Sequence, residues 1–120
     1  MKTTHKRAIQ AYIVLNQMGR KVSGRTAYAL FLLKNELKTV VDFQSEEEAK
    51  LTEKYGGQIT EEGAIVIADK EKAAAFRKEY AELGNMECEI KGEPATVDLD
   101  AAPEVTMQEI EALDGLVKFK

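Results

Sequence analysis

The sequence lacks several features that would place it in a specialised class of protein. It has no tryptophan, two prolines and one cysteine, Cys88, among 120 residues. One cysteine cannot form an internal disulfide, which excludes the disulfide scaffolds of small secreted proteins and favours a reducing cytoplasm. No apolar run approaches the ~18 residues that span a bilayer, and the first residues show no hydrophobic region or cleavage site of a signal peptide. We therefore expect a cytoplasmic protein that does not associate with membranes.

Residue types used in catalysis and metal binding are also scarce. His5 is the only histidine, and it lies near a terminus that we expect to be mobile. A metal site would need further ligands of this kind beside it. Cys88 is predicted to face inward from a strand between Glu87 and Glu89, where a nucleophilic thiolate is not favoured. We therefore predict no enzymatic activity, no metal site and no cofactor.

The remaining composition is that of an ordinary folded domain. Hydrophobic residues make up 44% of the chain and charged residues 32%, which excludes disordered and collagen-like classes. The length suits one core. We expect a single domain over residues 1–120, with a helical hairpin at 4–57 followed by a small α+β subdomain at 58–120.

Charge is divided unevenly along the chain. The formal net charge is −4, but residues 1–44 carry +6 and residues 45–120 carry −10. This asymmetry predicts that the basic segment pairs with the acidic remainder, within the fold or between copies, or else binds an anion such as nucleic acid. A net acidic chain repels phosphate at long range, which disfavours nucleic acid. The basic residues available for such a surface are Lys2, Lys6, Arg7, Arg20, Lys21 and Arg25.

Two helices are predicted in the first half. Apolar residues recur at three- and four-residue steps over 4–18, and again over 25–55, where no Gly or Pro interrupts. A capping-box pattern at Ser45 leaves two shorter helices, 24–43 and 46–55, as the alternative. We favour one continuous helix beginning near Ser23, whose hydroxyl can accept a hydrogen bond from an amide of the first turn.

The long helix carries more apolar surface than one short neighbour can cover. Residues 26–33 are apolar nearly all round, which indicates burial on several sides. We expect this helix to project and to pair with another copy of itself, giving a homo-oligomer. The residues predicted to make that contact are Leu30, Leu33, Lys34, Leu37, Val40 and Leu51.

The second half predicts an α+β arrangement. The expected elements are a buried strand at 64–67, a helix at 70–83, an antiparallel hairpin of strands 86–91 and 95–100, and a short helix at 107–113. Asp69 and Thr106 are the predicted N-caps of the two helices. The fold class is therefore α+β, with the helical hairpin packed on a small antiparallel sheet and helix 70–83 covering one face of that sheet.

One segment imitates a nucleotide-binding motif. Residues 19–26 match the phosphate-loop pattern except that Arg25 stands where the lysine belongs. A phosphate loop follows a buried parallel strand, whereas an amphipathic helix precedes this segment, and an arginine fork does not replace the lysine freely. We interpret Gly19 and Gly24 as the stop and start signals of two helices.

The order of several helix motifs resembles a known group of proteins. The motifs are Arg-Thr-Ala-Tyr-Ala-Leu at 25–30, Leu-Thr-Glu-Lys-Tyr-Gly at 51–56, Phe-Arg-Lys-Glu-Tyr-Ala-Glu-Leu at 76–83 and Ile-Glu-Ala-Leu at 110–113. Over roughly residues 4–114 the chain resembles a family of small uncharacterised bacteriophage and prophage proteins with a helical hairpin and a small acidic sheet.

The resemblance implies a function without supplying catalytic residues. It implies a non-enzymatic phage or prophage protein that acts through protein–protein contacts, in virion assembly or as an accessory factor. Its partner would be another copy or another phage or host protein, in the host cytoplasm or the virion. The alternative is a nucleic-acid-binding accessory protein that uses the basic N-terminal segment.

Overall fold

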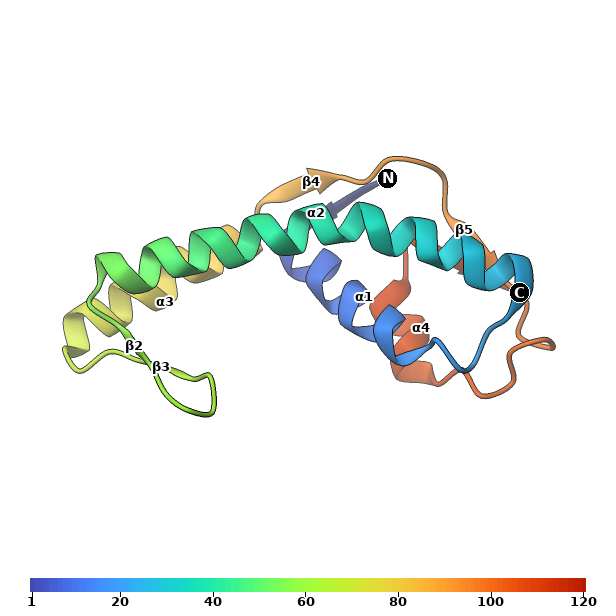
Figure 1. Cartoon of the computed structure of the whole chain (residues 1–120). Helices are drawn as coiled ribbons and strands as arrows, with labels where there is room; N and C mark the ends of the chain where they lie inside the picture. The colour runs from blue at the N-terminus through green and yellow to red at the C-terminus, as the bar shows by residue number, and fades with distance from the viewer.

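The computed structural model describes all 120 residues and has an α+β fold built along one long helix (Figure 1). The elements in chain order are β1 (Lys2–Thr4), α1 (His5–Gln17), α2 (Gly24–Lys54), β2 (Gln58–Ile59), β3 (Ile65–Val66), α3 (Lys70–Gly84), β4 (Glu87–Glu89), β5 (Ala95–Val97), α4 (Met107–Leu113) and β6 (Val117–Phe119). The predicted fold class and all four predicted helices are confirmed.

Helix α2 runs unbroken through Ser45, so the alternative of two shorter helices is wrong. It ends where the sequence supplies a glycine: Gly56 has φ 65°, a left-handed conformation that glycine adopts without a Cβ penalty. Helix α1 packs beneath the first part of α2, and α3 lies along its last part (Figure 1). None of the helices combines the length and hydropathy that crossing a membrane requires.

The core lies between α1, the first half of α2, α4 and the strands near the C-terminus. Ala8 and Ala11 of α1 are fully buried, and their small side chains leave room for close packing against larger neighbours. The cluster consists of Ala8, Ala11, Leu15, Met18, Leu30, Leu33, Leu37, Val40, Ile90, Val97, Ala102, Leu113, Leu116 and Val117.

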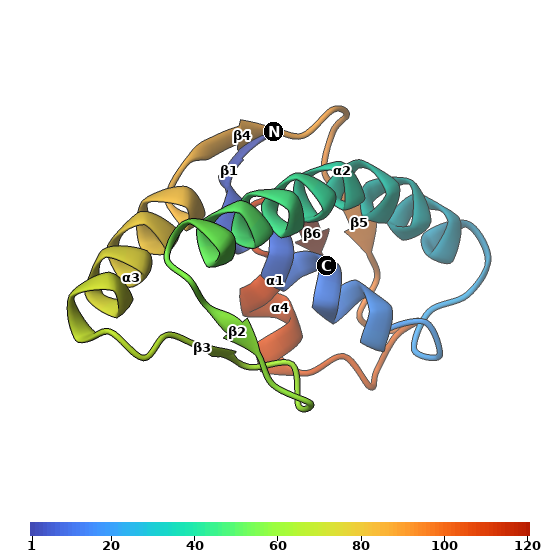
Figure 2. The ribbon, with the colours of Figure 1, turned by 60° about the vertical axis from the view of Figure 1, so that its left-hand side comes forward.

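The predicted hairpin of strands 86–91 and 95–100 is wrong. Strand β4 pairs antiparallel with β1, with Thr3 opposite Cys88, and β5 pairs parallel with β6, with Thr96 opposite Lys118. Both chain ends therefore supply strands, as Figure 2 shows for β1 beside β4 and β5 beside β6. Alternating apolar residues indicate a half-buried strand but do not specify its partner. Helix α3 accordingly packs against α2 and α1 rather than over a sheet.

Strands β2 and β3 form a short antiparallel hairpin that leaves the C-terminal end of α2 and projects to one side, below the helices in Figure 1. The predicted burial of residues 64–67 is wrong, because Val66 is 52% exposed and Ile59, on the paired strand, is 69% exposed. A hairpin of two short strands buries too little apolar surface to form a core of its own.

The two helix caps permit a direct comparison. The Asp69 carboxylate accepts hydrogen bonds from the amides of Glu71 (2.9 Å) and Lys72 (3.1 Å), whereas Ser23, at the start of α2, makes no such bond, contrary to prediction. We expect Asp69→Ala to lower the free energy of unfolding by about 1 kcal/mol. The matched Ser23→Ala variant should remain close to wild type. Urea denaturation measures both, and equal losses would contradict the assignment of the Asp69 cap.

Candidate protein interface

Four of the residues predicted to contact a second copy lie in the core of their own chain. Leu30, Leu33, Leu37 and Val40 are at most 9% exposed. They cannot contact a second copy without opening the domain, so this part of the predicted interface is wrong. The stripe is covered instead by α1 and its neighbours in the same chain.

The other two predicted contact residues are half-buried. Lys34 holds its ammonium group 5.6 Å from the centre of the Tyr12 ring on α1. A cation over an aromatic face is attracted by the ring quadrupole, so Lys34 contributes to the helix–helix contact within one chain. Leu51 lies in the last two turns of α2, far along the helix from the other five.

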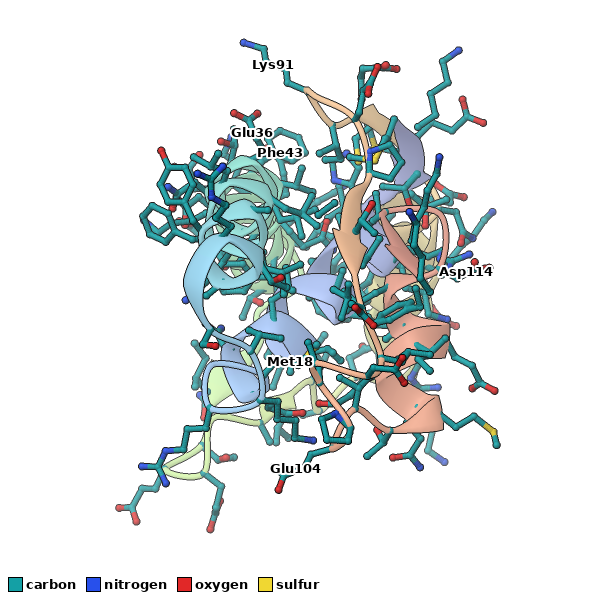
Figure 3. The ribbon with its side chains drawn as sticks, turned by 90° about the vertical axis from the view of Figure 1, so that its right-hand side faces the viewer. Met18, Glu36, Phe43, Lys91, Glu104 and Asp114 are labelled. Carbon is teal, nitrogen blue, oxygen red and sulfur yellow. The ribbon has the colours of Figure 1, made fainter.

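A different face of α2 is available to a partner. Tyr28, Phe31 and Leu32 are 62%, 53% and 48% exposed. Their three- and four-residue spacing places them side by side on a helix, and the rings of Tyr28 and Phe31 stack with centroids 6.4 Å apart. We call these three residues the outer patch. Seen from the N-terminal end of α2, many side chains of this helix point away from the rest of the molecule (Figure 3).

The outer patch forms a ridge between two grooves. Phe31 borders a groove of about 160 Å³ shared with Val22 and Lys34. Leu32 borders a groove of about 530 Å³ between α2 and the segment joining β4 to β5, which includes Lys91. A ridge flanked by grooves suits helix–helix packing, because the ridges of another helix can enter the grooves.

The sequence contained a signal for the outer patch, which the prediction missed because it considered one apolar stripe of the helix. Residues 26–33 are apolar nearly all round. Once one stripe of such a segment enters the core, the opposite side chains remain on the surface. An exposed group of large apolar side chains on a folded domain is typical of an interaction site.

Two members of the basic set are engaged with the acidic half of the chain. The Lys21 ammonium donates to the Glu109 carboxylate at 2.8 Å. The Arg7 guanidinium donates to the carbonyls of Glu111 (3.4 Å) and Asp114 (3.0 Å), at the C-terminal end of α4, where a cation is favoured. These contacts favour pairing of the basic segment with the acidic half of the same chain over an anion-binding surface formed by the basic residues together. Lys6, Arg20 and Arg25 are exposed.

A surface hollow of about 1000 Å³ lies between α1 and α4 and is lined mainly by polar side chains. Its lining includes the side-chain amides of Gln10, Asn85 and Gln108. The Arg7 guanidinium, which also lines it, donates to the Asp114 carbonyl. No serine, cysteine or histidine lines it. The arrangement therefore provides amide, cationic and carboxylate groups for polar contacts.

The surroundings of the single histidine, His5, and the single cysteine, Cys88, are those of side chains packed in the fold. His5 is buried, contrary to the expected mobile terminus, and its ring meets Phe43 edge-on at 5.4 Å between centroids. Burial raises the pKa of the Cys88 thiol, and the charge of Glu89 adds to this, so the thiol is neutral near pH 7. No three His, Cys, Asp or Glu side chains lie where they could hold a metal ion.

Residues 19–26, which imitate a phosphate loop, comprise most of the connection between α1 and α2 and the first three residues of α2. A helix precedes this segment, as the sequence predicted, so it lacks the buried strand that positions a phosphate loop. The outer patch therefore remains the best candidate for a functional surface. No family model matches this chain, and no curated protein or solved structure shows significant similarity to it.

Proposed function

We propose that this chain is a non-enzymatic phage or prophage protein that acts through protein–protein contacts, in virion assembly or as an accessory factor, and that self-associates through the outer patch. The phage origin is inferred from the helix motifs described above. The interaction role is carried by one observation, the three adjacent large apolar side chains exposed on α2.

The shape of the molecule supports this proposal. Its extents are 52 × 28 × 21 Å and its radius of gyration is 16.7 Å, against about 14 Å for a compact chain of this length. The accessible surface is 8331 Å², whereas a compact monomer of 13.4 kDa exposes roughly 6,500 Å². The difference exceeds the ~800 Å² that each partner buries in a standard interface.

The size of the patch sets the expected strength of association. Each of its three side chains has about half its surface left to bury, worth roughly 1 kcal/mol. Six such side chains, from two copies, supply about 6 kcal/mol, at the low end of the ~4–15 kcal/mol cost of association. The flanking grooves must therefore also be covered, and we expect an association that depends on protein concentration.

Light scattering coupled to size-exclusion chromatography tests the proposal. We expect the wild-type mass to rise above 13.4 kDa with concentration, and the Phe31→Ser/Leu32→Ser variant to stay at the monomer mass with unchanged circular dichroism. The matched control is Met107→Ser, which changes an exposed apolar residue on α4 and should associate like wild type. A wild-type chain that stays monomeric at every concentration would refute self-association.

A further inference from the structure

We propose that two copies pair through α2 in antiparallel orientation, about a two-fold axis between Phe31 and Leu32, with Arg25 of each copy facing Glu36 of the other. This inference rests on the proposed function, because it specifies the partner and geometry of the same outer patch. The occupant of the patch is a second copy of this chain.

The pattern of the outer face is self-complementary. In a two-fold interface the same surface meets itself, so its apolar centre must lie on the axis and its charged edges must oppose unlike charges. Phe31 and Leu32 form the apolar centre. Arg25 lies on the N-terminal side of this centre and Glu36 on the C-terminal side, and both side chains are exposed.

Arg25 and Glu36 are positioned to meet across that axis. They are eleven residues apart, which is about three helical turns, so they lie on the same side of α2. Rotation about the axis brings Glu36 of the second copy within about 3 Å, along the helix, of the level of Arg25. Neither residue has an ion-pair partner in its own chain. Lys38, which comes level with Arg25, lies on the other flank and pairs with Asp42 at 3.6 Å.

Parallel pairing through the same face is less favourable. It would leave Arg25 of one copy and Glu36 of the other about 16 Å apart along the helix, so this ion pair could not form. It would also align the two helix dipoles, which antiparallel helices oppose favourably. In the antiparallel pair, Tyr28 comes level with Asn35 of the second copy, and the phenol and the side-chain amide have complementary hydrogen-bonding groups.

Cysteine cross-linking distinguishes the two orientations. In a Cys88→Ala background, Leu32→Cys alone should form a disulfide-linked dimer under mild oxidation, because residues beside the axis face each other. Tyr28→Cys and Asn35→Cys chains should cross-link when mixed but not when oxidised separately. Facing positions on helices packed 8–10 Å apart fall within the ~4.4–6.8 Å Cα separation of a disulfide. Met107→Cys is the matched control and should remain monomeric.

The outcomes separate this inference from the proposed function. A Tyr28→Cys chain that links to itself as fast as to Asn35→Cys would indicate parallel pairing and overturn the inference while leaving self-association intact. Dimers by light scattering without a Leu32→Cys disulfide would overturn it in the same way. Absence of dimers by light scattering would refute both self-association and the inference.

A charge exchange provides a second, independent test. Arg25→Glu and Glu36→Arg should each weaken dimerisation by about 3- to 10-fold, as expected for two edge ion pairs replaced by like charges. Combining both substitutions in one chain should restore affinity to near the wild-type value. Arg77→Glu makes the same charge change on α3, away from the outer patch, and should have little effect. A double variant no tighter than the weaker single variant would contradict the Arg25–Glu36 pairing.

Discussion

Replacement of Leu37 by alanine is expected to lower the free energy of unfolding by about 2–5 kcal/mol. Leu37 is fully buried, at the middle of the stripe where α2 meets the core. Removing its isobutyl group costs the transfer free energy of the lost atoms and leaves a cavity among neighbours that relax only in part. Urea denaturation monitored by circular dichroism measures the effect.

Leu32→Ala is the matched control, because the same change is made five residues further back on the opposite side of the same helix. Leu32 is nearly half exposed, so its truncation should cost less than about 1 kcal/mol in dilute, monomeric protein. The pair therefore separates the inward stripe of α2 from the outer patch. Equal losses for the two variants would show that the two faces have been assigned incorrectly.

Replacement of Lys21 by methionine is expected to cost about 2–4 kcal/mol at pH 7. The Glu109 carboxylate is almost fully buried and accepts hydrogen bonds from the Lys21 ammonium (2.8 Å) and the Thr106 amide (2.8 Å). Methionine keeps an apolar chain of similar length but leaves the carboxylate without its cation. A buried charge that loses its partner destabilises the fold more than an exposed one.

The cost of Lys21→Met should depend on pH. Burial alone would raise the pKa of the Glu109 carboxyl, but the hydrogen bonds from Lys21 and Thr106 outweigh it and hold the pKa below its ordinary value of 4.5. A group whose folded pKa is depressed adds stability above its unfolded pKa, and this contribution disappears as pH falls through the folded value. The difference between wild type and variant should therefore shrink below about pH 4.

Urea denaturation at pH 7 and pH 3 tests this dependence. The control is Lys50→Met, which removes an exposed lysine paired with Glu47 at 3.2 Å and should change stability little at either pH. A loss for Lys21→Met that stays constant between the two pH values would show that the charge of Glu109 does not carry the effect.

The helices of this protein were determined by local sequence. Apolar residues at helical spacing, without Gly or Pro, predicted α2 as one element of 31 residues. Asp69 and the Thr106 capping box predicted the starts of α3 and α4, and both sets of hydrogen bonds are present. Such features act over one or two turns, so they can be recognised without knowledge of the rest of the chain.

The strand partners and the free face of α2 were decided by tertiary structure. The alternation around Cys88 and Val97 predicted half-buried strands, but their partners come from the two chain ends, far away in the sequence. The segment around Phe31 is apolar on both sides, so its sequence is compatible with either side facing inward. Packing of α1 and β5 against α2 buried the Leu30–Leu37 side, because only there could these elements share one core.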